Sequence, residues 1–181
     1  MGLADDVDEI LIPEEVLQDR IRELGRRISL EYGTKEPLLV GILTGAFVFL
    51  ADLLKAITIP CNVDFMATAS YGDATESSGI VRILKDLNQS IEGRHVLVVE
   101  DIIDTGLTMD YLLETLKARY PASLRVCALL DKRPRRRREV PIDFRGFEIP
   151  DKFVIGYGLD YSGRYRNLPF IGVLKPELYG I

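Results

Sequence analysis

Residues 95–108 combine a buried strand, an acidic loop and the start of a helix, and this stretch constrains the fold more than any other. Four consecutive aliphatic residues, 96–99, are typical of a strand that is covered on both faces, as in a parallel sheet. Two adjacent carboxylates, Glu100 and Asp101, end the predicted strand. Apolar side chains then recur at helical spacing, at Met109, Leu112, Leu113 and Leu116. The stretch therefore predicts a strand–loop–helix unit of an α/β protein.

The loop inside this unit has the residues of a phosphate-binding turn. Backbone N–H groups at a helix N-terminus carry partial positive charge and lack partners within the helix. Gly106 allows close approach of the backbone, and Thr105 and Thr108 add hydroxyl donors. Three carboxylates in the same loop would repel a bare phosphate, so the ligand is expected to carry hydroxyl groups and Mg²⁺ near its phosphate. A ribose 5-phosphate fits that description, and the alternative is a plain turn whose acids cap the helix.

Apolar runs and helical patterns alternate along the rest of the chain. Further buried strands are predicted at about 38–43, 62–69 and 124–130, and a strand returning from a hairpin at 80–84. Helices are expected over about 13–33 and 47–57. This alternation predicts the fold class α/β, a parallel-centred twisted sheet flanked by helices on both faces, with its ligand at the carboxyl ends of the strands. The apolar face of the first helix is predicted to comprise Val16, Leu17, Leu24 and Ile28.

The composition is that of an ordinary globular protein of 181 residues, a length that predicts one domain. No apolar run reaches the roughly 18 residues needed to span a membrane, and the acidic N-terminus is unlike a signal peptide. Cys61 and Cys127 lie in apolar, strand-like segments and are expected to be reduced core residues. With one histidine in the chain, a zinc site is not expected. We therefore expect a cytoplasmic protein with no membrane partner.

Six of the seven residues from Lys132 to Arg138 are cationic. Such a cluster is compatible with nucleic-acid binding, because phosphate backbones attract cations. The net charge of −5 and the lack of interleaved aromatic residues or a helix-turn-helix module argue against that function. The run is therefore interpreted as a solvated loop, and a nucleic-acid partner is not expected. Lys132 is the exception, since it follows a predicted strand at the level of the acidic loop.

The segment from Glu100 to Thr108 resembles the phosphoribosyl-pyrophosphate-binding motif of the type I phosphoribosyltransferases, and within them the hypoxanthine-guanine branch. The resemblance implies that Glu100 and Asp101 hold the ribose hydroxyls and Mg²⁺. It also implies that Asp104 is the general base that accepts a proton from the purine. The residues implied to bind the 5-phosphate are Asp104, Thr105, Gly106, Leu107 and Thr108.

A second stretch, residues 146–161, resembles the purine-binding segment of the same family. By that resemblance Phe153 stacks on the base, the Val154 backbone contacts the base edge, and Asp160 lies near the purine 2-position or a second Mg²⁺. Lys132 matches the lysine that binds the 6-oxo group, a contact that favours hypoxanthine and guanine over adenine. Arg166 matches the arginine that binds pyrophosphate.

Two shorter matches complete the implied site. Thr44 and Gly45 match the turn that binds pyrophosphate, although many family members have lysine in place of Thr44, and the preceding Leu43–Thr44 bond is often cis in this family. Ser70 and Tyr71 match the start of a mobile loop, so residues 70–79 are expected to form a lid that keeps water from the reacting ribose. The alternative for these residues is an ordinary hairpin tip.

The resemblance implies a single domain over residues 1–181, with a core at about 36–143 and a hood formed by the N-terminal segment and about 144–181. The implied reaction is Mg²⁺-dependent transfer of 5-phosphoribose from phosphoribosyl pyrophosphate to hypoxanthine and guanine, giving IMP, GMP and pyrophosphate in purine salvage. A homodimer or homotetramer is expected, as is common in the family. The alternatives are a xanthine-preferring or adenine-specific transferase, a pyrimidine-type relative that regulates RNA, and a regulatory relative that binds DNA.

Overall fold

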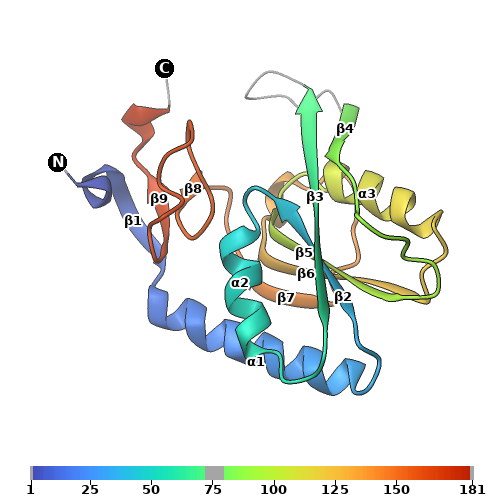
Figure 1. The fold of residues 1–181 in the computed structure, drawn as a ribbon. Helices are drawn as coiled ribbons and strands as arrows, with labels where there is room; N and C mark the ends of the chain where they lie inside the picture. The colour runs from blue at the N-terminus through green and yellow to red at the C-terminus, as the bar shows by residue number, and fades with distance from the viewer. Residues whose placement is uncertain (1, 72–79, 180–181) are drawn as a thin grey trace.

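The computed structural model describes residues 2–71 and 80–179, and the larger of its sheets forms the centre of the fold (Figure 1). The strands of this sheet are β2 (Leu38–Leu43), β3 (Asn62–Tyr71), β4 (Ile80–Lys85), β5 (His95–Ile103), β6 (Ser123–Asp131) and β7 (Phe144–Glu148). They lie in the order β4-β3-β2-β5-β6-β7, and every neighbouring pair is parallel except β3 and β4. The predicted parallel-centred sheet is therefore confirmed.

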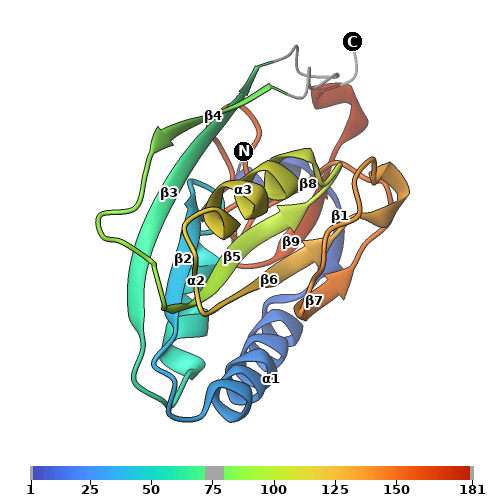
Figure 2. The same cartoon turned by 90° about the vertical axis from the view of Figure 1, so that its right-hand side faces the viewer.

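Helices cover both faces of this sheet. The helices are α1 (Glu14–Tyr32), α2 (Phe47–Ala56) and α3 (Leu107–Lys117). Helices α1 and α2 lie on one face and α3 lies on the other (Figures 1 and 2). Alternate residues of β5 serve the two faces, because Leu97 and Val99 pack with α1 and α2, whereas Val96 and Val98 pack with α3. Two separate apolar cores thus hold β5 at the centre of the molecule.

The apolar face of α1 differs from the prediction at one residue. Val16 is 42% exposed, whereas Leu17, Leu24 and Ile28 are fully buried as expected. The buried stripe continues through Ile21, which the prediction omitted. Buried positions spaced three or four residues apart follow one side of a helix, and Val16 lies one position off that side.

A smaller sheet joins the two ends of the chain. It consists of β1 (Val7–Ile12), β8 (Val154–Ile155) and β9 (Ile171–Leu174), with β9 antiparallel to both neighbours. Strand β1 was not predicted, because its middle residues are exposed and only Ile12 is buried. Strand β7 begins at Phe144, where the hood was expected to start, yet it belongs to the six-stranded sheet. Pairing with a distant strand therefore defines the ends of the chain more than their local pattern does.

The remaining described elements are short 3₁₀ turns at Leu3–Asp6, Arg133–Arg135 and Pro176–Leu178. Both cysteines are free thiols; Cys127 is buried in β6 and Cys61 is half-buried. None of the described helices has the length and apolar character that crossing a membrane requires.

Candidate active site

The predicted acidic pair lies inside β5 rather than at its end. The strand continues to Ile103 because Ile102 and Ile103 still pair with Leu130 and Asp131 of the neighbouring β6. Glu100 and Asp101 are only 9% and 7% exposed, and neither forms a salt bridge with any residue that the structure describes. Two carboxylates are thus held side by side in a nearly dry environment.

Burial shifts the protonation of this pair. Loss of water raises the pKa of the Glu100 carboxyl well above its usual value, and the neighbouring charge of Asp101 raises it further. Burial also raises the pKa of Asp101. Buried acids without a cation are costly, so this pair is suited to a ligand that brings positive charge, either a metal ion or a cationic reacting centre.

The loop that follows forms a small hollow at the N-terminus of α3. Gly106 caps the helix with a φ of 82°, a left-handed conformation that favours glycine. A side chain at this position would also collide with the backbone oxygen of Arg138, 2.3 Å from the position of a Cβ. The hollow has a volume of about 110 Å³. Its lining residues are Glu100, Ile102, Ile103, Asp104, Thr105, Gly106, Thr108 and Met109.

Leu107 is the one member of the predicted phosphate loop that does not line this hollow. Its backbone N–H lies 3.5 Å from the Thr105 hydroxyl oxygen, a long contact within the turn. Helix α3 begins at Leu107, so the N–H groups of its first turn have no acceptor within the helix.

Asp104 presents one carboxylate oxygen without a partner. Its Oδ1 is buried and has no hydrogen-bond partner among the described residues, while its Oδ2 lies 3.7 Å from Nη1 of Arg135. A buried unpaired acceptor is unfavourable in a resting protein and is suited to accepting a proton from a bound ligand.

The turn after β2 lies directly against the acidic pair. The Leu43–Thr44 peptide bond is cis, as the resemblance implied. Glycine is required at position 45, because a Cβ there would lie 1.8 Å from Oδ2 of Asp101. On its other side, the Gly45 carbonyl oxygen lies 2.3 Å from where a Cβ of Gly158 would be. The turn after β2, the Asp101 side chain of β5 and the backbone of the C-terminal region therefore converge at Gly45.

Arg166 is held beside this point of convergence. Its Nη1 donates a hydrogen bond to the Gly158 carbonyl, and its Nη2 lies 2.7 Å from Oδ1 of Asp160. Asp160 also accepts a hydrogen bond from the backbone N–H of Gly163. The structure thus brings Arg166 and Asp160 together near Thr44 and Gly45, and Gly158 is a packing residue that sequence reasoning missed.

A separate pocket contains Lys132 and Phe153. Lys132 is 6% exposed and forms a 3.0 Å ion pair with Asp151. The Phe153 ring stacks on Tyr179, with a centroid separation of 4.8 Å and an interplanar angle of 27°. Val154 follows in β8 and is buried. The pocket is lined by Asp8, Lys132, Arg135, Asp151, Lys152, Phe153, Val173, Pro176 and Tyr179.

The predicted lid lies mostly outside the described residues. The backbones of Ser70 and Tyr71 end β3 and pair with Val81 and Ile80 of β4. Residues 72–79 are not described, so the lid remains a prediction.

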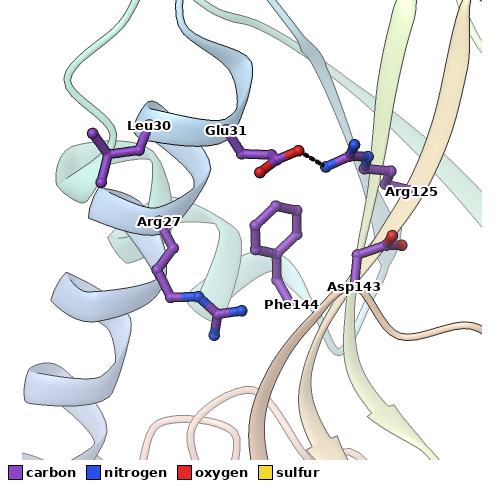
Figure 3. A pocket seen from close by; sticks show the side chains of 6 residues that line it. All are labelled: Arg27, Leu30, Glu31, Arg125, Asp143 and Phe144. Atoms are coloured by element: carbon purple, nitrogen blue, oxygen red, sulfur yellow. Dashed lines mark hydrogen bonds and ion pairs between the residues drawn. The ribbon is translucent and has the colours of Figure 1, made fainter.

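A second hollow lies at the opposite end of the sheet, between α1 and the start of β6 and β7 (Figure 3). Two of its charged residues form an ion pair, Arg125 and Glu31, at 2.7 Å, and Arg27 lies over the Phe144 ring at 5.7 Å. Asp143 accepts a hydrogen bond from the Val126 backbone. None of the predicted site residues lines this hollow.

The arginine run is not simply a solvated loop, which corrects the sequence interpretation. The side chain of Arg136 is 6% exposed and forms an ion pair with Asp131, itself 1% exposed. Other arginines of the run also face acids: Arg133 faces Glu139, Arg135 faces Asp104 and Arg138 faces Asp110. This pairing further weakens the nucleic-acid alternative, because these cations are already compensated.

Residues 6–162 match the family model described as the phosphoribosyl transferase domain. The match covers most of the chain and includes the acidic loop. The chain belongs to the phosphoribosyltransferase family. The resemblance found in the sequence is therefore confirmed.

Individual relatives of this phosphoribosyltransferase are similar over nearly its full length. A hypoxanthine-guanine phosphoribosyltransferase of Bacillus subtilis is 51% identical over 174 residues, which cover 96% of this chain and 97% of that protein. A bifunctional protein TilS/HprT of Listeria monocytogenes is 53% identical over 178 residues. The match covers 98% of this chain but spans only 28% of the length of that relative.

The fold of this phosphoribosyltransferase is also similar to solved structures. A crystal structure of a hypoxanthine phosphoribosyltransferase from Staphylococcus aureus superposes with a TM-score of 0.95 at 45% sequence identity, covering 99% of this chain and 97% of that one. The likeness confirms the α/β architecture with helices on both faces of the sheet.

Some residues of the site escaped sequence reasoning. Asp131 is the last residue of β6, and Glu100 and Asp101 lie near the end of β5. An acidic residue at the end of a predicted strand was therefore the sequence signal that could have identified Asp131. Arg136 and Gly158 lie in stretches that the sequence singled out, but the contacts of Arg136 with Ile103 and Asp104, of Gly158 with Gly45 and of Tyr179 with Phe153 gave no local signal, because they join segments far apart in the chain.

Proposed function

We propose that this phosphoribosyltransferase acts in purine salvage and transfers 5-phosphoribose from phosphoribosyl pyrophosphate to hypoxanthine and guanine. The products are IMP or GMP and pyrophosphate. One observation carries the proposal: the buried acids of β5, which form no ion pair with a described residue, lie beside a helix N-terminal loop. Strand β6, which pairs with β5, leads directly into an aromatic pocket containing a buried lysine. That arrangement suits a phosphate, a ribose and a base in one ligand.

The loop from Asp104 to Thr108 is proposed to bind the 5-phosphate through backbone N–H groups and threonine hydroxyls. Glu100 and Asp101 are proposed to hold the ribose hydroxyls. As the bond to pyrophosphate loosens, positive charge develops on the ribose ring. The two buried carboxylates favour that charge more than water would, because they are already oriented in a low-dielectric site.

Glu100 and Asp101 are also the residues proposed to hold Mg²⁺. This ion is commonly bound by one or two carboxylates together with substrate oxygens and water, and the adjacent buried carboxylates match that donor set. When bound, Mg²⁺ would stabilise the departing pyrophosphate. Asp160 is proposed to lie near the purine 2-position or a second Mg²⁺, although it is paired with Arg166 in this structure.

Asp104 is proposed as the general base that takes a proton from the five-membered ring of the purine. Its unpartnered Oδ1 supports this role, because a base must have a free acceptor within reach of the proton. The neighbouring Arg135 contacts only the other oxygen, at 3.7 Å.

The base and the pyrophosphate have separate proposed contacts. Lys132 would donate to the 6-oxo group, Phe153 would stack on the ring, and the Val154 backbone would bind the base edge. Thr44, Gly45 and Arg166 are proposed to bind pyrophosphate, with the planar guanidinium suited to two phosphate oxygens.

The three-stranded sheet, which brings Val154 next to β9, is proposed to act as a hood over the base within a single domain. Ser70 and Tyr71 are proposed to begin a lid. Assembly into a homodimer or homotetramer and a cytoplasmic location remain predictions from the resemblance.

Steady-state assays with hypoxanthine, guanine, xanthine and adenine, each with and without Mg²⁺, test the proposed function. We expect Mg²⁺-dependent release of pyrophosphate with hypoxanthine and guanine. Turnover of xanthine alone would favour the xanthine-preferring alternative. Turnover of adenine alone, or none with any purine, would contradict the proposal.

A further inference from the structure

The segment that follows β6 lies directly behind the phosphate loop. Backbone N–H groups of Arg137 and Arg138 both donate to the carbonyl of Thr105, at 2.8 and 3.0 Å. The N–H of Lys132 donates to the carbonyl of Ile103 at 2.9 Å. We call residues 132–138 the arginine strap, because they bind the loop from its rear side.

Arg136 makes the central contact of the arginine strap. Its Nε donates to the Asp104 carbonyl at 3.1 Å, and its Nη2 donates to the Ile103 carbonyl at 3.2 Å. The same guanidinium pairs with the buried carboxylate of Asp131 at 2.5 Å. Arg145 lies 3.4 Å from the other oxygen of Asp131 and fixes that carboxylate in turn. One buried side chain therefore joins the ends of β5 and β6.

These contacts fix the direction of the loop N–H groups. Three successive carbonyls, of Ile103, Asp104 and Thr105, all face the arginine strap. In a planar trans peptide the N–H points away from its carbonyl, so the N–H groups of the next three residues, 104–106, face away from the strap. Within the described part of the chain, the N–H groups of Thr105 and Gly106 have no protein acceptor. Successive N–H groups turned to one side form an anion-binding concavity.

We propose that Arg136 is a positioning residue for the 5-phosphate: by holding the carbonyls of Ile103 and Asp104 from behind, it orients the loop N–H groups toward the phosphate of the ribosyl substrate. The inference rests on the proposed function, since it concerns the same loop. Arg136 itself does not touch the substrate and acts through the backbone.

Arginine is suited to this position because three acceptors surround one planar group. The guanidinium has five N–H donors in a rigid fork and stays charged, whereas a lysine amine is a single point of charge. A lysine could keep the pair with Asp131 but would not bridge both carbonyls in the same geometry. The aliphatic part of Arg136 also packs against Gly106, where its Cδ lies 3.0 Å from the position of a Cβ.

The test compares Arg136→Met, Arg136→Lys and the control Arg133→Gln in steady-state kinetics with both substrates varied. For Arg136→Met the KM for phosphoribosyl pyrophosphate is expected to rise roughly 10- to 100-fold, the loss of one or two charge-assisted hydrogen bonds. Arg136→Lys is expected to restore part of that loss. The KM for hypoxanthine is expected to stay within about twofold in both variants, a split that general destabilisation would not produce.

Arg133→Gln removes a cation from the same run and is expected to change neither KM, because the Arg133 side chain lies 51% exposed, 3.7 Å from the exposed Glu139. Circular dichroism and the thermal midpoint establish that each variant is folded. If Arg136→Met does not fold, Arg136→Lys decides the question. An unchanged KM for phosphoribosyl pyrophosphate in a folded Arg136 variant, or equal rises in both KM values, would overturn the proposal.

Calorimetric binding of ribose 5-phosphate separates this inference from the proposed function. Binding weakened in the Arg136 variants but not in Arg133→Gln supports the positioning role even if the wild-type protein turned over no purine. Equal binding by all four proteins would reject the role of Arg136, whereas wild-type turnover would still support the proposed function.

Discussion

The acidic residues near the amino end of β5 and β6 and those near the carboxyl end of β5 differ in whether they form ion pairs. At the amino end, Glu31 is paired with Arg125, and His95 shares a hydrogen bond with Ser123. At the carboxyl end, Glu100 and Asp101 are buried without a salt bridge to any described residue. Asp131 at the carboxyl end of β6 is paired with Arg136 and Arg145, so the uncompensated acids at this end are those of β5, Glu100 and Asp101.

The pKa shifts follow this difference. The hydrogen bond from Arg125 lowers the pKa of Glu31, so the folded protein favours its charged form. Burial raises the pKa of Glu100, so folding disfavours the charged form of that carboxyl. Acids that lower stability are common at functional sites, so the raised pKa values support the proposed site at the carboxyl end of β5.

The largest effect is expected for Asp104→Asn. The change keeps the shape of the side chain but removes its ability to accept a proton, so turnover should fall by about two to four orders of magnitude. The measurement is kcat with both substrates saturating. Unchanged kcat would remove Asp104 from the role of general base.

Replacing Glu100 by glutamine tests whether the buried carboxylate without an ion pair lowers the stability of the protein. The raised folded-state pKa means that Glu100 contributes stability at low pH, and that this contribution is lost as the pH rises. The variant should therefore melt about 2–4 °C higher than wild type at pH 8, with a smaller gain at pH 4. Its kcat/KM should fall on the order of 100-fold, because a charge that favours the ribosyl cation is gone. A lower melting temperature at pH 8 would contradict the comparison.

Gly45→Ala tests the close packing at the carboxyl end. Its Cβ would lie 1.8 Å from Asp101 Oδ2, so the carboxylate or the turn must move. We expect a loss of about 1–3 kcal/mol in the free energy of unfolding, measured by denaturant titration. The same change made in an Asp101→Ala background should cost less, and equal costs in the two backgrounds would show that Asp101 is not the obstacle.

The smallest effect is expected at the amino end, for Glu31→Gln. The lowered pKa of Glu31 means that its contribution to stability is present above the unfolded-state pKa and is lost as the pH falls through the folded-state value. The melting temperature of the variant should be slightly lower than that of wild type at pH 7, and the two melting temperatures should be equal at pH 3. High salt should shrink the difference at pH 7, because the pair is exposed to solvent. Loss of enzyme activity in this variant would contradict the proposal that only the carboxyl end of the sheet takes part in catalysis.

Local patterns were sufficient for much of the fold. The aliphatic run at 96–99 predicted a strand buried on both faces, and the structure buries alternate residues of β5 in two different cores. The same reasoning placed Val16 in the core, where the structure exposes it, because a one-residue error in helical phase changes the face. Strand β1 was missed, since half-exposed edge strands lack a strong pattern.

In the candidate site too, features set by neighbouring residues in the sequence were predicted, whereas contacts between distant segments were not. Contiguous residues, from Glu100 to Thr108, were predicted together because the chain itself keeps them adjacent. The contact of Gly45 with Asp101 and the ion pair of Arg166 with Asp160 were not predicted as contacts, although the residues were named. Such contacts depend on how separate strands and loops come together.

The sequence by itself determined the buried strands of the sheet centre, the helices that cover them and the strand–loop–helix unit that contains the acidic loop, because periodicity and local composition encode burial and turn geometry directly. Only the tertiary structure decided the contacts of the arginine run, which the sequence could interpret only as surface charge. Pairing of β5 with β6 places Arg136 between Asp131 and the loop carbonyls, and these partners satisfy a guanidinium that could not otherwise be buried.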